Sequence, residues 1–477
     1  MNLQSPRLSQ ARNHLEWLRV LTCRVLFGAA VLAGCNASAH DDTVREPREI
    51  ETHSEPRESR ELHEMRESGG GERADQTARE NAKSHGGSTS KQGGGGSSGR
   101  SAADDERSGS SENDEAEERE GSKDSIRSDT STRLISDRIR VERDALGRER
   151  QSGEVLMIGG AQSVAAVRAA GYVVFGERQL SSFAETIARI RVGAGESVEQ
   201  AMLAIQRLAP DAGVAPNHIY RPSVAEAGSA ASQPLHATAA VKGSMLGVID
   251  AGADPAWAGL GRAILRTQGF AAGGYAPRTH GTVVAEIAAA EGAQLEVADV
   301  FGTDDDNRLV APAQAIAEAI DWLVAEGVPV INISIEGPDN LVLAHVIRRA
   351  LAGNVAIVAA AGNGGPAAAP AYPAAYPGVT AVTAIDEQGQ VYRRANRGDY
   401  IAFAARGVHI VSAYGAPLPR SLSGTSFAAP VVAAAIGRKL AAMHTRDVHA
   451  ALAALQAEAI DLGATGRDPI YGWGEIR

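Results

Sequence analysis

Segments that predict strands alternate with segments that predict helices from about residue 243 onward. The apolar stretches "GSMLGVID", "LEVADVFG", "PVINISI" and "VAIVAAAGN" predict strands. The stretches "GTVVAEIAAAEG", "PAQAIAEAIDWLVAEG" and "NLVLAHVIRRALAGN" predict helices between them. Because parallel strands need crossovers of this kind, the alternation predicts an α/β fold with a parallel sheet and helices on both faces. Ligands of such sheets bind beyond the carboxyl ends of the strands, so catalytic side chains are expected there.

The composition is very different before this region. The chain has 477 residues and a formal net charge of -11 at pH 7, and residues 41–150 are mostly Glu, Arg, Asp, Ser and Gly. Large apolar side chains are too sparse there to offset the entropy of ordering, so we expect a disordered spacer over residues 36–152. A low-complexity insertion without a role is the alternative. The acidic balance, with Arg and Glu interleaved, does not indicate nucleic-acid binding.

The N-terminus carries the pattern of an export signal. Arginines precede the apolar run "VLFGAAVLAGC", which is too short to span a bilayer because a helix needs about 20 apolar residues for that. The run ends at Cys35 in a sequence that resembles a bacterial lipobox. The resemblance implies a signal peptide over residues 1–35, a lipid anchor on Cys35 and a cell-envelope protein, on the outer membrane where the host has one. Cleavage after Ala39, which would yield a soluble exported protein, and an apolar helix of no consequence are the alternatives.

A small α+β domain is predicted between residues 153 and 222. Its strand and helix patterns follow the order βαββαβ, which is the ferredoxin-like order. The small and polar residues 223–242 that follow predict an exposed linker.

Three polar residues stand where the parallel sheet predicts chemistry. Asp250 ends the first strand, His280 begins a helix in "RTHGTVVAEIAA", and Ser426 begins an apolar helix in "LSGTSFAAPVVAA". Taken singly, they predict a turn aspartate, a histidine without chemistry and a helix N-cap. The order Asp, His, Ser with these neighbours resembles the subtilisin-like serine proteases over residues 243–477.

This resemblance implies a serine endopeptidase that works through an acyl-enzyme. A serine hydroxyl is a poor nucleophile until a base removes its proton, which would be the role of His280. Asp250 would hold the imidazole tautomer and stabilise the imidazolium. Asn363, in "AAAGNGGP", would donate its side-chain N–H to the oxyanion together with the backbone N–H of Ser426. A plain turn residue is the alternative for Asn363.

The resemblance also implies a substrate-binding strand. Ser334, Ile335 and Glu336 would pair with an extended peptide, and Ala361 and Gly362 would border the specificity pocket. The closing segment "DPIYGWGEIR" resembles the end of the family's domain.

The chain departs from the family pattern at three places. Ala251 stands where Ser or Thr is usual, Glu336 where Gly is common, and Arg406 where Pro is usual. None of these changes removes a catalytic atom, so they bear on substrate preference rather than on activity.

The same resemblance implies a function for the small domain. Residues 153–222 would be a propeptide that assists folding and inhibits the enzyme, and the linker 223–242 would hold a site of self-cleavage. The partners expected are therefore a protein or peptide substrate and the chain's own propeptide. No cofactor is expected, because the acidic loop 304–307 is most simply a solvated turn, with calcium as the alternative.

Two other functions stay open. A catalytically inactive binding protein on this fold would be expected to lack at least one of Asp250, His280, Ser426 and Asn363, and all are present. An esterase would favour a G-x-S-x-G elbow, which "GTSFA" is not.

Overall fold

The computed structural model describes residues 138–223, 226–229, 245–415 and 419–477, with residues 226–229 described through their backbone alone. The expected signal peptide, Cys35 and most of the expected spacer lie outside the described residues. Within the described ranges, no helix combines the length and the apolar character that crossing a membrane requires.

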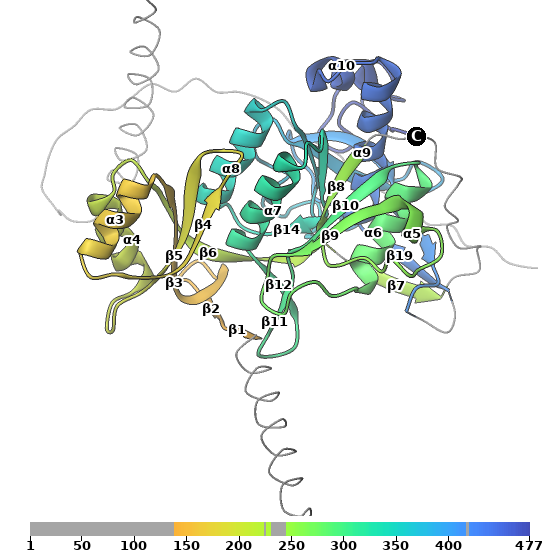
Figure 1. The fold of residues 1–477 in the computed structure, drawn as a ribbon. Helices are drawn as coiled ribbons and strands as arrows, with labels where there is room; N and C mark the ends of the chain where they lie inside the picture. The colour runs from red at the N-terminus through yellow and green to blue at the C-terminus, as the bar shows by residue number, and fades with distance from the viewer. Residues whose placement is uncertain (1–137, 224–225, 230–244, 416–418) are drawn as a thin grey trace, which may run out of the picture. The chain divides into compact units, whose positions relative to one another are not determined.

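The larger part of the described chain is built on a seven-stranded sheet (Figure 1). Its strand order is β17-β16-β15-β13-β8-β10-β9, and every neighbouring pair is parallel. The strands are β8 (Met245–Asp250), β9 (Ile264–Gly269), β10 (Gln294–Asp299), β13 (Val330–Ile333), β15 (Ala356–Ala360), β16 (Thr380–Ile385) and β17 (Ile401–Arg406). The predicted parallel α/β sheet is confirmed, and the inner strands β15 and β16 are buried throughout, as strands covered on both faces must be.

Helices cover both faces of this sheet. Val248 of β8 packs in one core cluster with α6 (Thr279–Ala290) and α9 (Thr425–Ala442), and Ile249 packs in another with α7 (Ala313–Ala325) and α8 (Leu341–Ala352). Neighbouring residues of a strand point to opposite faces, so the two helix pairs lie on opposite sides of the sheet. The remaining helices of this part are α5 (Leu260–Ala263) and α10 (Val448–Glu458).

The small domain has the predicted βαββαβ order and is confirmed as ferredoxin-like. Its elements are β3 (Glu149–Gly159), α3 (Ala161–Ala169), β4 (Val173–Leu180), β5 (Glu185–Arg191), α4 (Val198–Leu208) and β6 (Gly213–Pro222). Its strands pair antiparallel in the order β6-β3-β5-β4, and both helices pack on a core that includes Val155, Ile190 and Ile205. A capping box between Ser197 and Gln200 starts α4.

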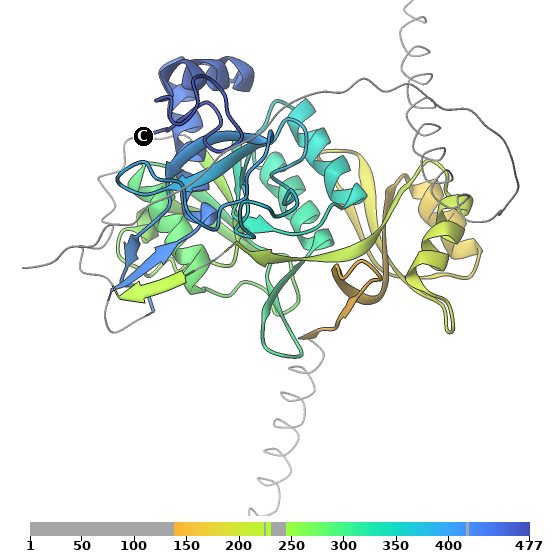
Figure 2. The same ribbon diagram turned by 180° about the vertical axis from the view of Figure 1, so that it is seen from behind.

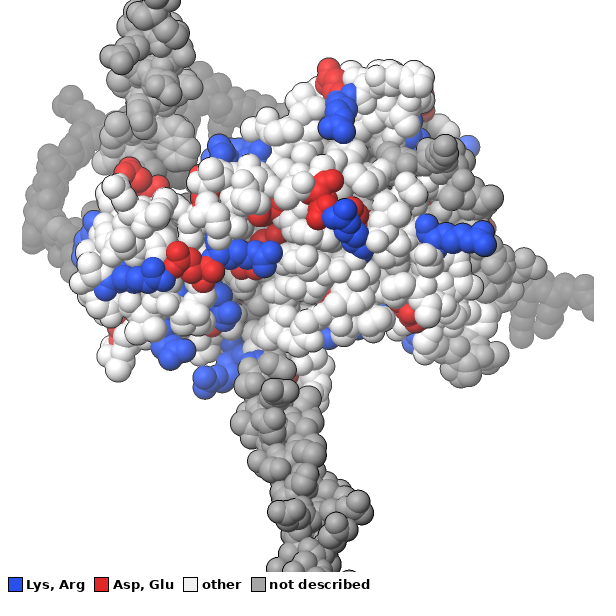
Figure 3. Space-filling model, in the orientation of Figure 1, with Lys and Arg blue, Asp and Glu red and all other residues white. Residues whose placement is uncertain are grey.

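The expected spacer 36–152 is wrong over residues 138–152. β1 (Arg138–Ile139) pairs with β11 (Gly302–Asp304), and β2 (Val141–Arg143) pairs with the start of β3. The charged residues that suggested a solvated segment bind one another across this hairpin, as Arg150 does with Glu142 at 2.8 Å. On the face in Figure 3, Lys and Arg side chains of the small domain likewise lie next to Asp and Glu.

The strand β6 connects the two domains. Beyond its pairing with β3 it pairs antiparallel with β12 (Leu309–Pro312) and β14 (Ile335–Glu336), which belong to the larger domain. Figure 2 shows β6, in yellow-green, as a long strand that runs from the small sheet to the parallel-sheet domain. The segment that follows it, β7 (Glu226–Ser229), joins a three-stranded sheet with β19 (Arg420–Ser423) and β18 (Ile410–Ser412).

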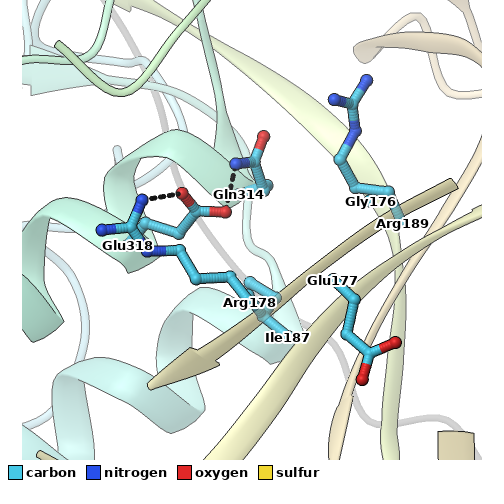
Figure 4. A pocket seen from close by; sticks show the side chains of 7 residues that line it. All are labelled: Gly176, Glu177, Arg178, Ile187, Arg189, Gln314 and Glu318. Carbon is cyan, nitrogen blue, oxygen red and sulfur yellow. Dashed lines mark hydrogen bonds and ion pairs between the residues drawn. The ribbon is translucent and has the colours of Figure 1, made fainter. Parts of the chain in front are cut away.

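Polar contacts also join α7 to the small domain. Asp321 accepts backbone N–H groups of Ser181 and Ser182 at 3.1 and 2.8 Å. A pocket of about 460 Å³ lies between β4, β5 and α7. Glu318, on the α7 side of this pocket, binds Arg178 at 3.2 Å and also binds Gln314 (Figure 4). Glu318 is buried, and this burial raises the pKa of its carboxyl. This pocket is a hollow in the domain interface, lined mainly by charged and polar side chains, of which Arg178 and Glu318 pair across the interface.

A buried histidine lies in the same interface. His218 of β6 is 2% exposed, and its Nδ1 is 3.2 Å from Nδ2 of Asn340, the residue that caps α8. Since an amide N–H₂ can only donate, Nδ1 accepts and the ring is neutral. Burial, followed by the charge of Arg148, lowers the pKa of His218 from 6.5 to about 4, although Asp144 acts in the opposite direction. The folded protein therefore resists protonation of this ring.

Acidification is expected to destabilise the protein through His218. Because its folded pKa lies below the unfolded value, its contribution is fully present above pH 6.5 and is lost as the pH falls from 6.5 to about 4. The free energy of unfolding should fall by about 3 kcal/mol through this group. Urea unfolding at both ends of this pH range measures the loss, and His218→Gln should remove that part of it. The exposed His449→Gln should not, and an unchanged pH dependence in His218→Gln would contradict the prediction.

Candidate active site

Asp250 and His280 meet at the carboxyl end of β8. Asp250 is the last residue of that strand and is fully buried, and its Oδ1 lies 2.7 Å from Nδ1 of His280 in the first turn of α6. Gly281 permits this approach, because a Cβ there would lie 1.8 Å from the carbonyl oxygen of Ala251. The sequence-predicted pair is therefore in direct hydrogen-bond contact.

The other polar atom of each side chain in this pair makes no described hydrogen bond. Among the described residues, neither Nε2 of His280 nor Oδ2 of Asp250 has a hydrogen-bond partner, although both are buried. Since a carboxylate only accepts, Nδ1 of His280 carries a proton, so in the neutral ring the lone pair lies on Nε2. That is the state a general base requires. The lone Oδ2 agrees with the alanine at position 251, which has no hydroxyl to offer it.

Ser426 lies in the first turn of α9, but it is not the helix cap. The capping position is Gly424, and the fully buried Ser426 directs its hydroxyl to the backbone carbonyl of Ser223, to which it donates a hydrogen bond. The ring centroid of Phe427, the residue after Ser426, lies 5.5 Å from that of His280, so Ser426 and His280 lie in the same region of the domain. The described hydrogen bonds do not include one between Ser426 and His280, because the hydroxyl is engaged by Ser223.

Asn363 binds the same carbonyl group. Its Nδ2 lies 2.6 Å from the carbonyl oxygen of Ser223, and its Oδ1 accepts from the backbone N–H and the hydroxyl of Thr425 at 3.1 and 3.2 Å. Thr425 thereby orients the amide so that its N–H₂ group faces Ser223. The carbonyl oxygen of Ser223 thus accepts hydrogen bonds from two groups, the hydroxyl of Ser426 and the side-chain amide of Asn363.

The predicted substrate strand is occupied by the chain itself. Ile335 and Glu336 of β14 pair antiparallel with Pro222 and Arg221, and the N–H of Ser223 donates to the carbonyl of Ser334 at 3.4 Å. This is the β-augmentation arrangement expected for a bound peptide.

Just upstream, the chain fills a further site of the larger domain. Tyr220 is fully buried and donates from its hydroxyl to the carbonyl of Pro338 at 2.7 Å. A Cβ at Gly337 would lie 2.4 Å from its ring. The last residues of β6 are thus bound through side chains as well as through backbone.

Glu336 contacts the end of the bound segment, Ser223, with its side chain. The sequence predicted that Glu336 bears on substrate preference, but it did not predict this contact. Its Oε2 accepts from the backbone N–H of Asn363 at 2.8 Å and from the hydroxyl of Ser223 at 3.0 Å. Burial raises the pKa of the Glu336 carboxyl.

The two small residues predicted to border the specificity pocket directly precede Asn363. Ala361 is buried, and its carbonyl accepts from the hydroxyl of Tyr400 at 2.8 Å. Gly362 has φ +108°, and its N–H donates to the hydroxyl of Thr425 at 3.2 Å. Thr425 therefore ties this small-residue segment to the start of α9.

The expected exposed linker 223–242 is wrong at its first residue. Ser223 is 0% exposed, because its backbone and side chain are both bound in the site. Sequence reasoning missed Ser223 and Thr425; the position of Ser223 directly after the predicted last strand of the small domain was the available signal.

The remaining polar candidates lie apart from this site. Arg406 pairs with Glu387 at 2.8 Å. In the acidic loop, Asp304 accepts backbone N–H groups of Asp306 and Arg308 and the guanidinium of Arg308, so its oxygens are already in use. In the part of the chain that the structure describes, no group of three or more His, Cys, Asp or Glu side chains is arranged to hold a metal ion.

A family model matches the part of the chain that contains these residues. The model of the subtilase family, peptidase S8, matches residues 242–474. This part of the chain belongs to the subtilase family. The subtilase domain thus begins beside β8 and contains Asp250, His280, Asn363 and Ser426.

Curated relatives and solved structures are similar to it. The minor extracellular protease Epr of Bacillus subtilis (strain 168) is 34% identical over 169 residues, which cover 34% of this chain and 26% of that protein. Subtilisin DY of Bacillus licheniformis is 34% identical over 153 residues, 31% of this chain and 56% of that protein. The chain therefore spans only about a quarter to a half of these two relatives, 26% and 56% of their lengths. Fervidolysin from Fervidobacterium pennivorans, a keratinolytic enzyme, shares the fold with a TM-score of 0.56 and 21% identity over 71% of this chain and 62% of that one.

Proposed function

We propose that the subtilase domain is a serine endopeptidase with Ser426 as nucleophile, His280 as general base and acid, and Asp250 as the residue that orients His280. The observation that carries the proposal is the carbonyl of Ser223, which is bound by Ser426 and Asn363 at the end of a strand paired like a substrate.

The chemistry follows from these contacts. The hydroxyl of Ser426 turns toward Nε2 of His280, gives up its proton, and attacks the carbonyl carbon of Ser223. Nδ2 of Asn363 and the backbone N–H of Ser426 stabilise the oxyanion, while Asp250 stabilises the imidazolium. The intermediate collapses to an acyl-enzyme as the leaving amine takes the proton from His280. Water, activated by the same His280, then releases the acid and restores Ser426.

The first substrate in this proposal is the chain itself. Cleavage would fall after Ser223, and residues 138–223 would act as an inhibitory propeptide, because the end of β6 fills the substrate strand before any other peptide can enter. We also propose that the protein is exported and anchored through a lipid on Cys35. The N-terminal sequence pattern supports this, and the relative Epr is named an extracellular protease.

One set of assays separates the proposal from its alternatives. The purified full-length chain should yield a fragment that ends at Ser223 in mass spectra. Once the fragment that carries β6 has dissociated, the protein should be labelled on Ser426 by a fluorophosphonate and should hydrolyse casein. Labelling without casein hydrolysis or a fragment would favour an esterase. An unlabelled and intact chain would favour an inactive binding protein.

Removing the oxyanion donor is expected to slow catalysis. Asn363→Ala should lower kcat about 10²- to 10³-fold with little change in KM, because the amide acts on charge that develops only in the transition state. The figure is the one typical of this residue in this family. Steady-state kinetics on a peptide substrate measure it, with Asn307→Ala in the β11–β12 turn as the control. A change in KM with kcat intact would contradict the assigned role.

A further inference from the structure

The hydroxyl of Ser223 is bound by three groups of the subtilase domain. It donates to Oε2 of Glu336 at 3.0 Å, accepts from Nδ2 of Asn363 at 2.7 Å, and lies 3.3 Å from the hydroxyl of Thr425. Ser223 is 0% exposed, so no solvent competes for these bonds. The side chain next to the proposed cleavage point is therefore recognised as specifically as its backbone.

The directions of these bonds require a hydroxyl. A carboxylate can only accept and an amide N–H₂ group can only donate, so a group between Glu336 and Asn363 must do both. A hydroxyl does so, with one hydrogen and two lone pairs. The bond to the carboxylate is also charge-assisted when Glu336 is ionised, which makes it one of the stronger kinds. The carboxylate is held in place by the backbone N–H of Asn363 at 2.8 Å.

We propose that Glu336 makes this protease selective for serine at the residue that supplies the carbonyl of the cleaved bond. The inference rests on the proposed function and adds the substrate side chain to it. Alanine there would remove the hydroxyl bond to the half-buried carboxylate of Glu336, which would keep the backbone N–H of Asn363 as its remaining described donor. An apolar side chain would place carbon against the same carboxylate oxygen. Sites built to bind a hydroxyl reject analogues that lack it much more strongly than apolar pockets reject an extra methylene.

A cationic side chain is the competing ligand for a carboxylate. The surroundings of Ser223 favour the hydroxyl, because the N–H₂ group of Asn363 and the carboxylate of Glu336 both contact the side-chain oxygen of Ser223. A lysine or arginine there would place its own N–H donors against the N–H₂ donor of Asn363. A preference for arginine or lysine would overturn the proposal.

The first test follows cleavage within the full-length chain. Ser223→Ala should slow the appearance of the two fragments about 10- to 100-fold, whereas Ser223→Thr, which keeps the hydroxyl, should cost only a few-fold. In a Glu336→Ala chain the additional effect of Ser223→Ala should shrink to a few-fold, because the partner is already gone. Glu336→Gln, which keeps an acceptor oxygen, should retain part of the effect. An equal effect of Ser223→Ala in both backgrounds, or no effect in either, would overturn the proposal.

The second test needs no variant at position 336. Chromogenic peptides Tyr-Arg-Pro-Xaa, which carry the sequence of residues 220–222, are given to the self-processed protein with Ser, Ala, Leu or Arg as Xaa. Serine should exceed alanine in kcat/KM by about 10- to 100-fold. Fluorophosphonate labelling and turnover without a preference for serine would refute this inference alone. Absence of both labelling and cleavage would refute the proposed function, and this inference with it.

Discussion

Ser426→Ala is expected to leave the chain uncut after Ser223 and to lower kcat on peptides about 10⁶-fold, the size of loss known for a subtilisin without its nucleophile. The hydroxyl of Ser426 is hydrogen-bonded to the carbonyl of Ser223, which it would attack. Alanine offers no atom that can form the acyl-enzyme. Denaturing electrophoresis over time measures the cut, and active-site titration with a fluorophosphonate measures the nucleophile.

Ser421→Ala is the matched control. Ser421 lies in β19, close along the chain, and Ser421→Ala makes the same chemical change outside the site. This control should process and label like the unmodified chain. A Ser426→Ala protein that still yields the fragment ending at Ser223 would show that another protease makes the cut.

Asp250→Asn is expected to lower kcat about 10⁴-fold while the fold is kept. An asparagine can turn its N–H₂ group to Nδ1 of His280, so that Nδ1 accepts and Nε2 carries the proton. The histidine is then in the wrong tautomer to take a proton from Ser426. The pH profile of kcat, measured beside thermal unfolding, should show lost activity with little loss of stability.

Asp254→Asn tests whether the effect belongs to Asp250 alone. Asp254 accepts from the hydroxyl of Tyr414 at 3.2 Å and from the N–H of Ala256, and it does not contact His280 in the described structure. Its exchange should change kcat by no more than a few-fold. Equal losses in the two variants would mean that charge near β8, rather than the tautomer of His280, controls activity.

The sequence predicts the parallel sheet, the ferredoxin-like order and the contact of Asp250 with His280, because each follows from a local pattern combined with a general rule. Apolar periodicity marks the elements, and the carboxyl ends of parallel strands meet at one edge. The contact of His280 with Asp250 depends only on the place of His280 in the first turn of its helix and on its small neighbour Gly281. Both features can be read from the sequence.

The parts that sequence did not predict depend on pairing between distant segments. Residues 138–152 look solvated by composition, but Ile139 is buried with Ile219 and Val310, far away in the chain. Ser223 looks like part of a linker, and its role arises from contacts with Glu336 and Asn363 more than a hundred residues later. Composition does not contain that information, since it does not say which strand edge a segment will join.

The strands on either side of Ser223 affect how the proposed cut could be observed. β6 is paired with β14 before this point, and β7 is paired with β19 after it. Hydrolysis of the bond between Ser223 and Val224 would break neither pairing, so the two fragments would keep migrating as one particle in native gels and size exclusion. Only denaturing conditions would reveal the nick. The same pairings would keep the catalytic fragment on the membrane wherever the other fragment carries the lipid, until the strand β6 itself dissociates.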